Sequence, residues 1–166
     1  MFNIGDLFRD VFQVRRCPTP AAFLSYMRHR NIYQLNNWVN WRNEYKRDTL
    51  PSHRWRSIDK ILADDVPGVG MFNDCEEQSI LKKFVTNVLG WATSRNLVTQ
   101  CMNITKNHAV CLSKRQDDIV LMDYTIKIFP ANTSVRKIVR EMYPEAQTFC
   151  FCDDAGHDIS GKVPVS

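Results

Sequence analysis

Apolar residues recur at helical spacing along the first 65 residues of the chain. Helices are predicted over residues 4–12, from Pro20 onward, over residues 35–45 and over residues 57–65. Thr19 is placed to cap the second of these helices, and Pro20 takes its first position, where proline is best tolerated. Pro51 breaks the third helix. We therefore expect residues 1–65 to form a helical N-terminal part.

The pattern changes beyond the turn-like sequence "VPGVG" at residues 66–70. A strongly amphipathic helix follows and is ended by Gly90. Its apolar face comprises Ile80, Leu81, Phe84, Val85, Val88 and Leu89. Strands are predicted over residues 97–105, 108–114, 118–125 and 146–154, with a helix over residues 134–144. Residues 66–152 are thus predicted to form an α+β core, with 153–166 as a loose tail.

The composition supports one globular domain covering residues 1–166, because 44% of the 166 residues are hydrophobic. The N-terminal sequence carries acidic residues within its apolar pattern, so it fits neither a secretory signal nor a membrane span. We therefore expect a cytoplasmic protein that does not bind membranes, with reduced thiols that are mostly buried. The six cysteines are Cys17, Cys75, Cys101, Cys111, Cys150 and Cys152.

The positive charge is concentrated in the first part of the chain. Residues 1–60 hold 11 Lys and Arg against 5 Asp and Glu, whereas the whole chain has a net charge of +4. A basic surface of this kind can attract nucleic acid or an acidic protein. A solvated helical surface explains the same charges, since no run of five basic residues occurs.

The sequence "FNDCEEQS" at residues 72–79 places a cysteine at the start of the amphipathic helix. Asp74 is predicted to cap this helix, and Glu77 completes the spacing of a capping box, so Cys75 takes the first helical position. The helix dipole favours a thiolate there by only ~0.3 to 1 kcal/mol. The neighbouring acids oppose a second negative charge, so a nucleophilic Cys75 would need a cationic partner such as an imidazolium.

His108 and Asp123 are the residues best placed to assist Cys75. If the strands 108–114 and 118–125 form a hairpin that is symmetric about Arg115 and Gln116, His108 faces Asp123 directly. Cross-strand Cβ atoms then lie roughly 4.5 to 5.5 Å apart, which lets the carboxylate accept a hydrogen bond from the imidazole. A one-residue bulge would break this pairing. In the same arrangement Val110 and Leu112 are expected to pack against the helix that carries Cys75.

The segment from about Tyr45 to Thr125 resembles the transglutaminase-like group of papain-fold cysteine enzymes, in particular the bacterial transglutaminase-like cysteine peptidases. "NDCEE" at 73–77 is similar to the Gly-Asp-Cys-Glu-Asp motif of the family, with Asn73 in place of Gly and Glu77 in place of Asp. "NHAVCL" at 107–112 and "VLMDYT" at 120–125 resemble the His and Asp strands, and Trp55 resembles an upstream Trp. The resemblance implies a papain/transglutaminase-like core in which a cysteine-bearing helix packs on an antiparallel sheet.

Together these features predict thiol-dependent acyl transfer or hydrolysis of an amide or peptide, with a protein or peptide as the substrate. Cys75 is the predicted nucleophile, His108 the general base and acid, and Asp123 the residue that orients the imidazole. Trp55, from the resemblance, and Gln78 are candidates for stabilising the oxyanion, although Trp55 also fits a plain core position. No cofactor and no metal are required.

Two alternatives remain open from the sequence alone. The same fold could serve as a catalytically inactive binding module whose basic N-terminal helices dock a protein or nucleic-acid partner. The sequence "CFCDDAGH" could also form a metal site from Cys150, Cys152 and His157. That spacing is not a usual zinc pattern, and alternating Phe and Cys are more typical of a buried strand.

Overall fold

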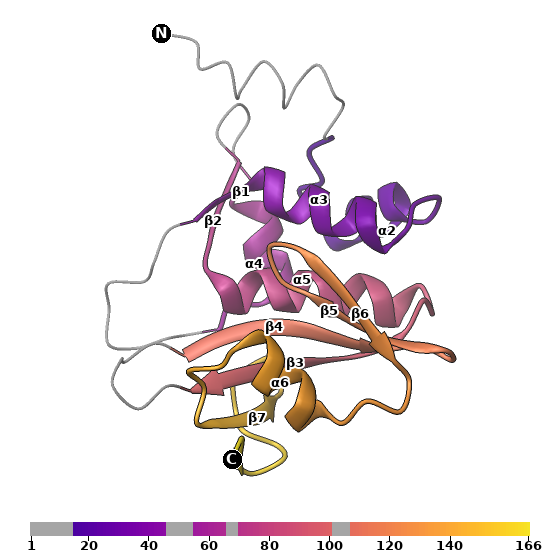
Figure 1. Ribbon diagram of the computed structural model, residues 1–166. Coiled ribbons are helices and arrows are strands. Elements are labelled where there is room, and N and C mark those ends of the chain that lie inside the picture. Colours follow the sequence, from indigo (N-terminus) through magenta and orange to yellow (C-terminus); the bar gives the residue numbers. More distant parts are fainter. Residues whose placement is uncertain (1–14, 46–54, 66–69, 101–106) are drawn as a thin grey trace, which may run out of the picture.

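The computed structural model describes residues 15–45, 55–65, 70–100 and 107–166, and Figure 1 shows its arrangement. Several predicted features lie outside the described residues. These are the helix over residues 4–12, the break at Pro51, most of the turn at 66–70 and the end of the first predicted strand, including Cys101. Within the described ranges, no helix is long and apolar enough to cross a lipid bilayer.

The described N-terminal part contains three helices, α2 (Pro20–Met27), α3 (Ile32–Arg42) and α4 (Ile58–Ala63). The Thr19 hydroxyl accepts a hydrogen bond from Ala22 N at 3.2 Å, and Pro20 begins α2, which confirms the predicted helix start. Helix α3 ends three residues before the prediction, because the chain becomes extended at Asn43.

The residues after α3 form a short strand instead of a further helical turn. Strand β1 (Asn43–Tyr45) pairs in parallel with β2 (Met71–Asn73), which leads directly into the cysteine-bearing helix. Gly70 has a φ of +97°, and a side chain there would collide with the carbonyl oxygen of Arg42. Glycine at position 70 therefore permits the close approach of the two strands.

Helix α5 (Cys75–Val88) is the central helix of the protein. One side packs on the N-terminal helices through a cluster of buried apolar side chains that includes Trp38, Ile61 and Leu81. Val88, predicted to lie on the buried face, is 56% exposed because it lies in the last turn, where the helix leaves the core. Gly90 follows the C-cap with a φ of +67°, as expected for a residue that ends a helix.

The core is a six-stranded sheet in which all neighbouring strands are antiparallel, in the order β6-β5-β4-β3-β7-β8. The strands are β3 (Thr93–Gln100), β4 (Asn107–Lys114), β5 (Asp118–Met122), β6 (Ile126–Pro130), β7 (Thr148–Cys152) and β8 (Val163–Pro164).

Two strands of this sheet were not predicted. Strand β6 lies at one edge, and only Phe129 within it is buried, so its burial does not follow the alternation that marks a half-buried strand. The tail from Ala155 onward was expected to be loose, but β8 pairs with β7 and Val165 is buried. The apolar residues Val163 and Val165 provide the reason, since both pack against the cluster beneath the sheet.

Helices cover both faces of the sheet, as Figure 1 shows. Helix α5 packs on the face that carries Ala109 and Cys111, while α6 (Val135–Met142) packs on the opposite face. The predicted packing of Val110 and Leu112 against the cysteine-bearing helix is therefore wrong, since these residues contact Ile138 and Val139 of α6. Side chains alternate along a strand, so the pattern shows which residues share a face but not which helix covers it.

Candidate active site

The N-terminus of α5 positions Cys75 through a capping box. Asp74 Oδ1 accepts hydrogen bonds from Glu76 N at 3.1 Å and from Glu77 N at 3.4 Å. Glu77 Oε2 in turn accepts one from Asp74 N at 3.1 Å. Cys75 is thus the first residue of α5, where backbone N–H groups of the first turn have no partner within the helix.

The Cys75 thiol is buried, with only 8% of the residue exposed. Its sulfur donates to Glu76 Oε2 at 3.2 Å and accepts from Ala109 N at 3.5 Å. Burial raises the pKa of the Cys75 thiol well above its usual range, and the Glu76 carboxylate raises it further, while the Ala109 N–H opposes the shift. The resting group is therefore a neutral thiol that must lose its proton during any reaction.

Arg56 offsets one of the negative charges near Cys75. Its guanidinium donates to the Glu77 carboxylate, to Asp64 and to Asn73 Oδ1, the last at 2.7 Å. Burial raises the pKa of Glu77, and the ion pair with Arg56 opposes that shift. No sequence pattern indicated Arg56, whose hydrogen bonds connect the segment before α4 to the start of α5.

His108 and Asp123 form the second part of the site. His108 Nε2 lies 3.0 Å from Asp123 Oδ2. The predicted direct pairing is wrong, because Leu112 pairs with Leu121 and the hairpin turns at Gln116 and Asp117. This register differs by two residues from the expected one, so both side chains stay on the same face and meet as diagonal neighbours.

Asp123 receives hydrogen bonds from helices on both sides of the sheet. The hydroxyl of Tyr143, the C-cap residue of α6, donates to Asp123 Oδ2 at 3.0 Å, and Lys82 Nζ of α5 donates to the Asp123 carbonyl oxygen at 2.8 Å. Burial alone would raise the pKa of Asp123, but the hydrogen bonds from His108 and Tyr143 hold it below its usual range. Asp123 is thus a stable carboxylate that can hold the imidazole in position.

The next residue, Tyr124, is anchored to the N-terminal part. Asn36 and Asn40 of α3 donate to the Tyr124 carbonyl oxygen at 3.3 and 2.8 Å. The Tyr124 ring stacks near the His108 imidazole, with 6.5 Å between the ring centroids. The helical part therefore helps to position the turn that carries Asp123.

Sequence reasoning also missed Lys82 and Tyr143. One signal for Lys82 was available, since it shares a helical stripe with Cys75, Ser79 and Thr86, and this stripe faces the sheet. Ser79 Oγ donates to Asn96 Oδ1 at 2.9 Å, and Thr86 Oγ1 to Ser94 Oγ at 2.7 Å. A lysine on an inward stripe is rare in proteins unless it is paired.

Cys75 lies beside the His108–Asp123 pair without bonding to it. Among the described residues, the thiol contacts Glu76 and Ala109 but makes no hydrogen bond to His108, the residue that precedes Ala109. Burial, together with the charge and the hydrogen bond of Asp123, raises the pKa of Tyr143. The His108 nitrogen that Asp123 does not engage is Nδ1.

The two predicted oxyanion candidates both lie near Cys75. Trp55 packs against the apolar cluster that contains Cys75, Val98 and Ala109. Gln78 is buried and follows Cys75 by three residues, on the same side of α5.

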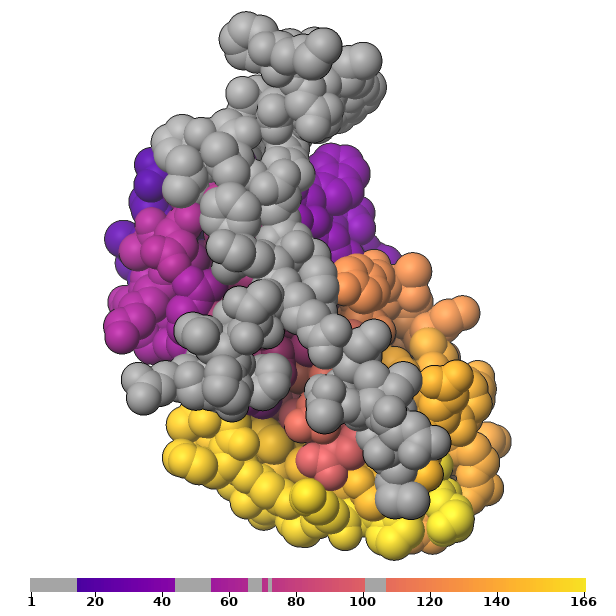
Figure 2. Space-filling view, turned by 90° about the vertical axis from the view of Figure 1, so that its left-hand side faces the viewer, coloured from indigo at the N-terminus to yellow at the C-terminus, as the bar shows by residue number. Residues whose placement is uncertain are grey.

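Figure 2 views the molecule from the side, with the N-terminal part in indigo to magenta above and the C-terminal segment in yellow below.

Gly156 makes room for Trp55, and its replacement by alanine is expected to displace the indole. A Cβ at Gly156 would lie 2.5 Å from Trp55 Nε1, and the φ of +81° adds backbone strain. We expect Gly156→Ala to lower the free energy of unfolding by about 2 to 4 kcal/mol, from strain and overpacking together. Chemical denaturation measures this loss.

Gly161→Ala provides a matched control, since Gly161 has a φ of +74° but no atom within 4 Å of a Cβ at that position. It should cost only the backbone strain, about 1 to 2 kcal/mol. Equal losses in the free energy of unfolding of Gly156→Ala and Gly161→Ala would show that the Trp55 indole does not obstruct a side chain at position 156.

The alternative metal site does not assemble in the described part of the chain. Cys150 and Cys152 lie close together, with their sulfur atoms 3.8 Å apart, and both are buried in β7. His157 instead points to Asp153, with 3.1 Å between Nδ1 and Oδ2. No group of three His, Cys, Asp or Glu residues in the described ranges is arranged to hold a metal ion. The described cysteines are all buried and unpaired.

The antiparallel sheet with helices on both faces defines an α+β protein with a transglutaminase-like fold, which confirms the predicted fold class. In particular, the chain is similar to the solved structure of LapG from Legionella pneumophila, with a TM-score of 0.52 and 15% identity over 86% of this chain and 74% of that one. EGTA-treated LapG from the same organism gives a TM-score of 0.51 and 14% identity, over 84% and 77% of the two chains. No family model and no curated protein matches the sequence. At these identities the likeness concerns the fold alone.

Proposed function

We propose that this protein is a thiol-dependent enzyme that hydrolyses an amide bond or transfers its acyl group to an amine, with a protein or peptide as its substrate. The observation that carries the proposal is the arrangement at one end of the sheet. Cys75 begins α5 and contacts Ala109 N, while the adjacent His108 is held by Asp123 at 3.0 Å. These contacts support a site in which Cys75 is the nucleophile, His108 the base and Asp123 the residue that orients the base.

The reaction starts from the protonated Cys75 thiol. His108 Nδ1 takes the proton of the Cys75 thiol as the sulfur forms a bond to the carbonyl carbon of the substrate. His108 then gives this proton to the leaving amine as the carbon–nitrogen bond breaks, which leaves a thioester on Cys75. Water or another amine attacks the thioester, loses its proton to His108 and releases Cys75 as a thiol.

In this reaction the Cys75 thiol must break its hydrogen bond to Glu76 and form one to His108. Hydrogen bonds between catalytic groups are often long or absent without substrate and form only in the complex. Asp123 limits the motion of the imidazole, because Nε2 is engaged and Nδ1 is left for the thiol. Tyr143, at the C-terminal end of α6, donates a hydrogen bond to the same carboxylate.

The negative oxygen of the tetrahedral intermediate would be stabilised by N–H groups near the sulfur. The backbone N–H of Cys75 lies at the helix start, where the helix dipole adds a favourable field. The Trp55 indole N–H and the Gln78 amide are the side-chain candidates. LapG, with which the chain shares its fold, is a transglutaminase-like cysteine peptidase, and this supports the same class of chemistry here.

Alkylation of the cysteines, followed residue by residue with mass spectrometry, tests the proposal. We expect iodoacetamide to modify Cys75 at neutral pH faster than Cys17, which is also buried but packs among the N-terminal helices. His108→Ala should slow the modification of Cys75 by about 100-fold, because the proton acceptor is lost.

His29→Ala is the control for this experiment, since His29 is exposed and lies beyond α2. It should leave the reactivity of Cys75 unchanged. If Cys75 reacts no faster than Cys17, or if His108→Ala has no effect, the enzymatic proposal fails and the inactive binding module becomes the better hypothesis.

A further inference from the structure

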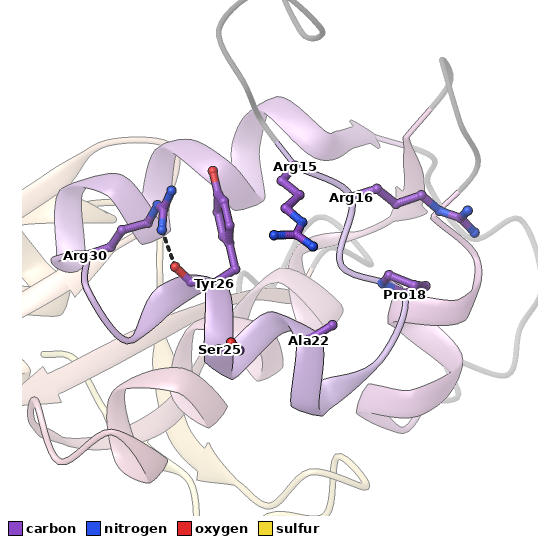
Figure 3. Close-up of a pocket in the computed structure, with 7 residues that line it drawn as sticks. All are labelled: Arg15, Arg16, Pro18, Ala22, Ser25, Tyr26 and Arg30. Atoms are coloured by element: carbon purple, nitrogen blue, oxygen red, sulfur yellow. Dashed lines mark hydrogen bonds between the residues drawn. The ribbon is translucent and has the colours of Figure 1, made fainter.

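A cavity lined by arginines lies on the helical N-terminal part, and none of its lining residues belongs to the candidate active site. It has a volume of about 630 Å³. Its lining residues are Arg15, Arg16, Pro18, Ala22, Ser25, Tyr26 and Arg30, and Figure 3 shows them. Three of these seven side chains are positively charged and none is acidic, so the cavity carries a concentrated positive charge.

Among the described residues, the arginines of this cavity have no carboxylate partner, unlike three other arginines of the protein. Arg42, Arg56 and Arg115 each form an ion pair with an aspartate or glutamate. Within the described ranges, Arg15, Arg16 and Arg30 form none. Arg30 donates to the Tyr26 carbonyl oxygen and Arg16 Nε donates to the Asp65 carbonyl oxygen at 2.6 Å, so each has further N–H donors to spare.

Contacts around the cavity fix the backbone of Arg15 and the guanidinium of Arg30. The Arg15 carbonyl oxygen accepts hydrogen bonds from Trp38 Nε1 at 2.9 Å and from the Cys17 thiol at 3.4 Å, which fixes the backbone. The Arg30 guanidinium lies over the Tyr26 ring, 3.5 Å from its centroid. In Figure 3, Tyr26 lies between the guanidinium groups of Arg15 and Arg30, whereas Arg16 extends away from them.

From this arrangement we infer that the cavity binds a small phosphorylated molecule, with Arg15 and Arg30 as the principal phosphate ligands. A guanidinium matches the geometry of two phosphate oxygens, and charge-assisted hydrogen bonds of this kind are about twice as strong as neutral ones. The Ser25 hydroxyl can supply a further donor. The volume falls within the range of about 300 to 1,000 Å³ that is usual for small-molecule sites, which favours a small ligand over a macromolecular one.

Isothermal titration of the full chain with pyrophosphate, at constant ionic strength set by sodium chloride, tests the inference. We expect saturable binding of one pyrophosphate per chain. Arg15→Gln and Arg30→Gln should each weaken it by about tenfold or more, because each removes a charge-assisted interaction. Arg28→Gln is the matched control, since Arg28 is exposed, carries the same charge and does not line the cavity.

Pyrophosphate binding that is absent, or that falls equally in Arg28→Gln, would overturn the inference, since the second result indicates a general attraction to positive charge. Vesicles containing anionic phospholipid provide one more arm. Binding to vesicles without binding to pyrophosphate would also overturn it, because the ligand would then be a membrane surface. Cys75→Ala should bind pyrophosphate normally, so the test is independent of the proposed enzymatic function.

Discussion

Replacement of Cys75 by alanine is expected to abolish turnover of amide and ester substrates, with a loss of about 10⁴-fold or more. The reason is that the thiol is the proposed nucleophile, and its sulfur accepts a hydrogen bond from Ala109 N, the residue next to His108. A panel of chromogenic esters, followed by peptide amides, provides the assay. In the wild-type protein, intact mass spectrometry should also detect the acyl group on Cys75.

Cys17→Ala is the control for this substitution. Cys17 is as buried as Cys75, but it lies among the N-terminal helices and not at the end of the sheet. Its removal should cost some stability and leave turnover close to the wild-type rate. An unchanged rate in Cys75→Ala, or an acyl group that forms on another residue, would contradict the role of Cys75.

The position of Cys75 could be predicted because it depends on neighbours in the sequence. A helix start is determined by the cap and by the residue three positions later, and Asp74 and Glu77 form these contacts in the structure. The apolar pattern of α5 is likewise local. Only the last turn departs from it, where Val88 is exposed.

The register of the hairpin between β4 and β5 could not be predicted in the same way. Arg115 N donates to the Asp118 carbonyl oxygen, and the Arg115 guanidinium donates to the Asp118 carboxylate. This interaction moves the centre of the turn by one residue, which shifts the pairing of the strands by two. His108 and Asp123 still meet, because a shift of two residues preserves the face on which each side chain lies.

The partners of Asp123 depend on tertiary structure, so no local pattern indicates them. Tyr143 lies twenty positions beyond Asp123 in the sequence and Lys82 forty-one positions before it. Tyr143 is the C-cap of α6 and Lys82 belongs to α5, and these helices cover opposite faces of the sheet. A strand pattern shows that two residues share a face, but it does not show which helix end lies above them. The same limitation explains why Val110 and Leu112 were assigned to the wrong helix.

Replacement of Lys82 by methionine is expected to stabilise the protein at neutral pH while lowering its activity. Lys82 is 1% exposed, and its ammonium donates a hydrogen bond to the Asp123 carbonyl oxygen, with no carboxylate partner among the described residues. Burial lowers the pKa of Lys82 to about 8, partly opposed by the nearby Cys111 and Asp123. Removing this charge while keeping the length of the side chain should raise the free energy of unfolding by about 1 to 3 kcal/mol.

The pH dependence of the effect distinguishes Lys82 from other groups. In the unfolded chain the lysine keeps its proton up to its ordinary pKa of 10.5, whereas in the folded protein it loses the proton near pH 8. Between these values the unfolded state binds more protons, so Lys82 makes wild-type stability rise with pH by up to about 1.4 kcal/mol per unit. The buried cysteines act in the opposite direction, because their raised pKa values favour the protonated folded form. The contribution of Lys82 is therefore the difference between wild type and Lys82→Met, measured by denaturation across this pH range.

Lys83→Met is the matched control, because Lys83 is the next residue of α5 and forms an exposed ion pair with Asp154. It should change stability by less than about 1 kcal/mol and leave the pH dependence unaltered.

Turnover should fall about tenfold in Lys82→Met, since the Asp123 carbonyl loses a charge-assisted bond that helps to position the site. If Lys82→Met destabilises the protein and retains the wild-type pH dependence, the burial of the Lys82 charge does not destabilise the folded state. If Lys82→Met is more stable than the wild type and fully active, Lys82 lowers the free energy of unfolding and does not position Asp123.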